Sequence, residues 1–97
     1  MNQQLHFIKP AESRPLPHDG IVSRSWRVGR FTVTLTLNTN YLEPSEIVQH
    51  TNAIWYPRMP TAKELSKSDL AAYRNGRNQL YQEIADMTGK TMLIADV

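Results

Sequence analysis

The clearest pattern in the chain is an alternation of apolar residues and threonine between Phe31 and Leu37. Both residue types favour strands, and a period of two is typical of a half-buried strand. A second alternation, from Val22 to Val28, runs in the opposite phase. Gly29-Arg30 separates the two and predicts a type II′ hairpin turn. One long strand with a glycine bulge is the alternative interpretation.

A third strand is expected near Val48–Tyr56, where β-branched and aromatic residues are frequent although they alternate poorly. Loop residues at 38–40 and 43–45 separate it from the hairpin. The prolines at 57 and 60 end it. Ser45-Glu46 could instead start a short helical turn.

A long helix is predicted from Lys67 to Met87. Capping-box spacings precede it at Thr61–Glu64 and at Ser66–Asp69, and Gly89 supplies the stop. Its apolar residues recur every three or four positions and fill an arc of about 100°. They are Leu70, Tyr73, Leu80, Ile84 and Met87.

Residues 91–97 read as a final, mostly apolar strand. The predicted class is therefore α+β, in the order β-β-β-α-β. We expect one small mixed sheet of about four strands with one helix on one face, and a right-handed crossover that makes the last strand parallel to the third. Residues 1–20 are expected to be a proline-containing tail or lead-in, either disordered or pinned by an edge strand. Residues 21–97 would form a single domain.

Composition narrows the class of protein only slightly. The chain has no cysteine, which excludes disulfides, thiolate metal sites and cysteine nucleophiles. Its net charge of +2 suits an ordinary soluble protein as well as a nucleic-acid-binding one. The first nine residues lack the signal-peptide pattern, and no apolar run is long enough for a membrane span. A cytoplasmic protein is expected, and its size and composition suggest a bacterial, plasmid or phage origin.

No motif in the chain recommends an enzyme. His6, His18 and His50 are scattered without the spacing of metal ligands. Gly29 and Gly76 stand alone, so there is no glycine-rich phosphate loop. The sequence therefore predicts a non-catalytic protein without a metal or cofactor.

Arg77 falls in the middle of the apolar arc of the predicted helix, where an unpaired charge would be costly. It is expected to extend to solvent or to pair with a carboxylate, and a ligand or partner site is the alternative. Gly76 beside it suggests the close approach of another backbone. Candidate carboxylates are Glu43, Glu46 and Asp96.

The segment Trp55–Pro60 combines aromatic residues, arginine and methionine, a composition typical of interface cores. The structural alternative is a loop that folds back and caps the sheet. The leading hypothesis is a small interaction or regulatory protein that binds a protein partner or a second copy of itself. Its predicted partner-binding residues are Trp55, Arg58, Tyr73 and Arg77.

A second hypothesis is a nucleic-acid-binding accessory protein that uses a basic hairpin. Residues 21–42 contain three arginines and no acid, and guanidinium groups are good phosphate ligands. The alternative is that these arginines only keep an exposed face soluble. The residues predicted for nucleic-acid binding are Arg24, Arg27, Arg30 and Arg74, with Lys63 and Lys67 as further candidates. A third hypothesis, a small enzyme or ligand-binding domain, requires a pocket with convergent polar groups.

Overall fold

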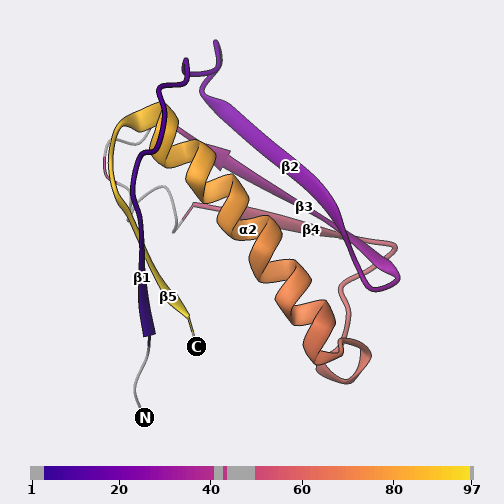
Figure 1. Ribbon diagram of the computed structural model, residues 1–97. Coiled ribbons are helices and arrows are strands. Elements are labelled where there is room, and N and C mark those ends of the chain that lie inside the picture. The colour runs from indigo at the N-terminus through magenta and orange to yellow at the C-terminus, as the bar shows by residue number, and fades with distance from the viewer. Residues whose placement is uncertain (1–3, 41–42, 44–49, 97) are drawn as a thin grey trace.

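The computed structural model describes residues 4–40, 43 and 50–96, with the backbone alone given for 4–6 and 94–96. Strands, one short 3-10 turn and one long helix follow in an α+β order that confirms the predicted class (Figure 1). The elements are β1 (Gln4–Ile8), β2 (Ile21–Val28), β3 (Phe31–Asn38), β4 (Asn52–Tyr56), η1 (Ala62–Glu64), α2 (Lys67–Thr88) and β5 (Met92–Asp96).

The predicted hairpin forms between β2 and β3. Val28 pairs with Phe31 and Trp26 with Val33, in an antiparallel register that excludes one continuous bulged strand. Gly29 has a φ of 62°, whereas every described residue other than glycine has a negative φ. This combination matches the type II′ turn expected for Gly29-Arg30.

The third predicted strand is present as β4, the last five residues of its expected range, and positions 48–49 lie outside the described residues. The alternative helical turn at Ser45-Glu46 also lies outside them. The predicted long helix is present as α2. Ser66 accepts a hydrogen bond from the Asp69 amide at 3.1 Å, and Gly89, with a φ of 69°, ends the helix.

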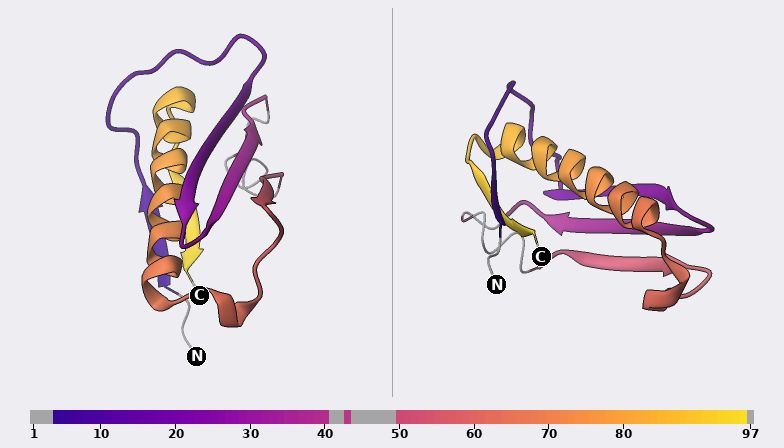
Figure 2. Two further views of the ribbon diagram at one scale, coloured as in Figure 1. Left: turned by 90° about the vertical axis from the view of Figure 1, so that its right-hand side faces the viewer. Right: turned by 60° about the horizontal axis from the view of Figure 1, so that its bottom comes forward.

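The strands form two antiparallel sheets, not the single mixed sheet that was expected. One sheet has the order β2-β3-β4, and the other consists of β1 and β5 (Figure 2). The expected parallel pairing of the last strand with the third is wrong, because Ile8 in the lead-in pairs with Met92 in β5. The lead-in thus forms the strand that was the alternative to disorder, and this strand supplies an antiparallel partner that needs no crossover.

Helix α2 contacts both sheets and completes the core. Its predicted arc is only partly buried: Leu80 and Ile84 are fully covered, Tyr73 and Met87 are half-buried, and Leu70 is 41% exposed. No helix in the described part of the chain is long and apolar enough to cross a membrane. The buried apolar residues are Val22, Val28, Phe31, Val33, Leu35, Leu37, Leu80, Tyr81, Ile84, Ala85 and Met92.

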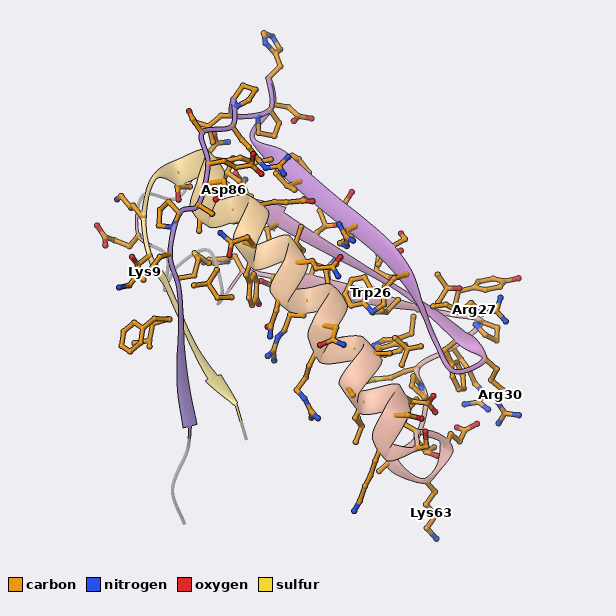
Figure 3. All side chains as sticks on the ribbon, viewed as in Figure 1. Lys9, Trp26, Arg27, Arg30, Lys63 and Asp86 are labelled. Carbon is orange, nitrogen blue, oxygen red and sulfur yellow. The ribbon has the colours of Figure 1, made fainter. Side chains whose placement is uncertain are left out.

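Trp26 fixes the position of α2 over β2. Its indole lies directly against Gly76, so closely that a Cβ atom at that position would overlap the ring. The indole, labelled beside α2 in Figure 3, also donates a hydrogen bond from its Nε1 to the Ala72 carbonyl at 3.1 Å. The close approach that Gly76 predicted is therefore real, but an indole ring makes it instead of a backbone.

Asp86 ties the lead-in to the far end of α2. Its side chain is only 2% exposed, and its Oδ1 accepts hydrogen bonds from the amides of Ala11 at 2.8 Å and Glu12 at 3.4 Å. Arg14 pairs with Oδ2 at 3.3 Å. Gln82 donates to the Lys9 carbonyl at 2.8 Å. Residues 9–14 are thus part of the folded structure.

We predict that Gly76→Ala lowers the free energy of unfolding by about 1–3 kcal/mol, because the added methyl group forces the Trp26 indole to move. Urea denaturation followed by far-UV circular dichroism measures the change.

Asn75→Ala is the matched control, because residue 75 is an exposed neighbour on the same helix. It should leave stability unchanged or slightly increased, since alanine has the higher helix propensity. Equal stability of the two variants would contradict the proposed contact.

We predict that Asp86→Ala abolishes the hydrogen-exchange protection of the Ala11 and Glu12 amides, because both lose their acceptor. The Ala11 hydrogen bond holds the pKa of Asp86 below its ordinary value. The contribution of the ionised carboxylate is therefore complete above the unfolded pKa and is lost as pH falls through the lower folded pKa. The Ala11 amide chemical shift, followed by NMR, should titrate below the ordinary aspartate range.

Glu12→Gln serves as the control, since it removes an exposed carboxylate from the same segment. Both amides should remain protected in it. Retention of their protection in Asp86→Ala would show that the lead-in is held by other contacts.

Candidate binding surface

Trp55 and Tyr73, two of the residues predicted to bind a partner, hold the sheet and the helix together. Their rings stack 5.7 Å apart at 22°, and Tyr73 also contacts Trp26 at 5.9 Å. All three side chains are half-buried against the core. Burial raises the pKa of the Tyr73 hydroxyl. The structure brings these two residues together, in a contact between β4 and α2.

Arg77 is half-buried, and its Nε and Nη2 donate to the side-chain oxygen of Asn78 at 3.2 and 3.1 Å. Two of its expected partners, Glu46 and the Asp96 side chain, lie outside what the structure describes. The third expected partner is Glu43, whose carboxylate Oε1 lies 3.8 Å from the Lys90 Nζ. Arg77 is thus separate from the arginines at the hairpin turn.

Arg24, predicted to bind nucleic acid, faces the helix. It pairs with Glu83 at 3.2 Å and donates to the side chain of Gln79. Both partners belong to α2, so this guanidinium contributes to the packing of β2 against the helix. Arg74 is exposed on α2 itself. The four arginines of the nucleic-acid hypothesis therefore do not form one surface.

Glu64 forms ion pairs with Arg58, which was predicted to bind a protein partner, and with Arg30, which was predicted to bind nucleic acid. It binds Arg58 through both carboxylate oxygens at 2.7 Å and Arg30 through one at 2.7 Å. Thr61 donates to the same carboxylate from its amide at 3.0 Å, as its capping-box spacing predicts. Both guanidinium carbons lie 5.5 Å from the centre of the Phe31 ring. Two cations are thus fixed side by side over a buried aromatic ring.

These contacts have a clear electrostatic consequence. Hydrogen bonds from Arg58, Thr61 and Arg30 hold the pKa of Glu64 far below its ordinary value, and Glu64 in turn raises the pKa of Arg58. One carboxylate serves two guanidinium groups, so the group keeps a net positive charge. The Arg30 side chain is 72% exposed and that of Arg58 is 57% exposed.

The face of the three-stranded sheet opposite α2 presents a row of side chains beside this group. Thr32 pairs with Arg27 on one side and with Tyr56 on the other. Since Trp26 points to the helix, strand alternation places Arg27 on the opposite face. Tyr56 is 74% exposed. Hydroxyl-bearing side chains continue this face, at Ser23, Ser25, Thr34 and Thr36.

We call the end of the molecule at the hairpin turn the tip surface, defined as Arg27, Arg30, Tyr56, Arg58 and Met59. Arg27 and Arg30 lie together at this end (Figure 3). Met59 is 75% exposed, and its carbonyl accepts a hydrogen bond from Arg58 at 3.3 Å. Sequence reasoning identified the three arginines and the segment around them. It did not separate exposed Tyr56 from half-buried Trp55, because that needs the register of β4 against β3.

The described residues contain no group of three or more histidine, aspartate or glutamate side chains that could hold a metal ion. Comparisons with models of protein families, with curated proteins and with solved structures gave no match to this chain.

We predict that Glu64→Gln increases the motion of the Arg30 and Arg58 side chains, because it removes the charge that holds both. NMR relaxation of the two Nε–H groups should show restricted motion in the wild type and fast motion in the variant. The Nε–H of Arg74, which is exposed on α2, is the internal reference and should not change. Restricted motion in both proteins would mean that the Phe31 ring alone orders the arginines.

Proposed function

We propose that this chain is a small non-catalytic binding protein that engages a macromolecular partner through the tip surface. The observation that carries the proposal is the exposure, at one end of the molecule, of three side-chain types that interfaces favour. Tyrosine, arginine and methionine are enriched in interface cores, and tyrosine and arginine are frequent among the residues that dominate binding energy. Here Tyr56 and Met59 are about three-quarters exposed.

The arrangement of the arginines supports the same proposal. Binding requires long side chains to lose rotamer freedom, at a cost of about 0.5–1.5 kcal/mol for each one. Glu64 already holds Arg30 and Arg58 in place through bonds of 2.7 Å, so much of this ordering precedes any encounter. Beneath the surface, the stacked rings of Trp55 and Tyr73 fix β4, the strand that ends at Tyr56.

The proposal narrows the partner-binding residues expected from the sequence. Arg58 belongs to the tip surface, whereas Trp55 and Tyr73 pack beneath it. Arg27 and Arg30, which were predicted to bind nucleic acid, also belong to the tip surface. The proposed surface therefore combines parts of the two sequence-based hypotheses.

Affinity capture from a lysate of the source cells tests the proposal. We predict that the triple variant Arg27→Ala, Tyr56→Ala, Met59→Ala loses the partners captured by the wild type, because it removes one of the three arginines and both of the large apolar side chains of this surface. Quantitative mass spectrometry and nucleic-acid staining of the eluates measure the loss.

The matched control is the triple variant Phe7→Ala, Arg74→Ala, Leu93→Ala. It also removes one arginine, one aromatic and one aliphatic side chain, all exposed and all outside the tip surface. This control should capture the wild-type set, and circular dichroism verifies that both variants are folded. Equal capture by the two variants would refute the tip surface as the binding site.

A further inference from the structure

We infer that the partner of the tip surface is single-stranded nucleic acid, an inference that rests on the proposed binding function. The first argument is charge. Residues 27–30 at the hairpin turn and residues 58–69, which contact the turn through Glu64 and Asp69, together carry five basic side chains and two carboxylates. The surplus of +3 exceeds the net charge of +2 carried by the whole chain, so the rest of the molecule is slightly acidic. The basic residues are Arg27, Arg30, Arg58, Lys63 and Lys67.

Second, an exposed ring and a cation share the face of the sheet opposite α2, at Tyr56 and Arg27. Tyr56 lies one strand away from Thr32 and two strands away from Arg27, which places its backbone about 10 Å from that of Arg27. Arg58 follows it two positions later in the chain. Proteins that bind single strands use this arrangement, in which bases stack on aromatic rings and phosphates contact cations.

The third argument concerns the shape of the sheet. A two-stranded ribbon can enter the major groove of a duplex, which is about 12 Å wide. Here β4 runs beside β3 up to the pair Thr32–Tyr56, one residue from the turn. Three strands already span about 10 Å between backbones before side chains are added. With side chains added, the three strands are wider than the groove, whereas the open face of the sheet is accessible to a strand with unstacked bases.

The hydroxyl groups of this face provide further hydrogen-bonding groups. Ser25 and Thr34 bond to each other at 2.6 Å, and Thr32 lies between Arg27 and Tyr56. Hydroxyl groups both donate and accept hydrogen bonds, so they can contact bases or sugars of any sequence. The inferred binding is therefore dominated by stacking and charge, with little sequence specificity.

Fluorescence anisotropy with labelled DNA and RNA strands of about 16 nucleotides, and with the matching duplex, tests this inference. At about 50 mM salt we expect both single strands to bind more tightly than the duplex. Tyr56→Ala should weaken binding about tenfold, since a stacked base contributes about 1–3 kcal/mol. Tyr56→Phe should restore it, because its ring presents the same stacking face.

Salt dependence tests the role of the arginines. Arg27→Ala should weaken binding and should lower the slope of log affinity against log salt by about 0.7, the value for one phosphate contact on a single strand. Arg74→Ala removes the same charge from outside the tip surface and should leave the slope unchanged.

Three results would overturn the inference: no binding to either single strand at about 50 mM salt, equal binding of the duplex with no effect of Tyr56→Ala, or equal losses in Arg27→Ala and Arg74→Ala. A nuclease-resistant protein captured by the wild type and lost in the tip variant would leave the proposed binding function standing and would show that the partner class is wrong. If the protein binds no single strand and the tip variant captures the same partners as the wild type, both this inference and the proposed binding function are refuted.

Discussion

The contact between Trp26 and Gly76 is the constraint on which the rest of the structure depends. The indole occupies the space that any larger residue at 76 would fill, and it bonds to the Ala72 carbonyl one turn earlier. This contact brings α2 against β2 and sets the distance at which Tyr73 can reach both tryptophans. Through Tyr73 the helix also contacts Trp55, so the position of β4 depends on the same glycine.

The hairpin turn and the start of the helix are joined in a second way. Gly29 lies against the Asp69 carboxylate, which also accepts a hydrogen bond from the Ser66 amide at 2.9 Å. Glu64, two residues before the Ser66 N-cap, binds Arg30 from the turn itself. Arg30 and Arg58 of the tip surface thus share hydrogen-bonded contacts with the residues that lead into the helix. Each such contact restricts the rotamers that a long side chain would otherwise populate.

Local sequence patterns predicted the elements well, because their causes are local. The phase reversal around Gly29 and the capping box at Ser66 depend on residues only a few positions apart, and both were confirmed. The pairing of β1 with β5 was not predictable in the same way. It joins strands more than eighty residues apart, and the proline-rich stretch after β1 resembles a linker. That stretch is held by bonds to Asp86 and Gln82, two polar residues near the end of α2 that carry no sequence signal for such a role.

The candidate site shows the same division between local and distant causes. The sequence identified the arginines but could not separate those that pack the fold from those that stay exposed. That distinction depends on which carboxylate each arginine contacts in the folded chain. Arg24 meets Glu83, 59 residues away, and becomes part of the packing. Arg30 and Arg58 share the single carboxylate of Glu64, so the three groups keep a net positive charge. An arginine with its own carboxylate contributes little to the attraction of an anion, whereas two that share one still attract it. The ratio of cations to carboxylates within each cluster is therefore the physical basis on which the proposal of polyanion binding selects the tip surface.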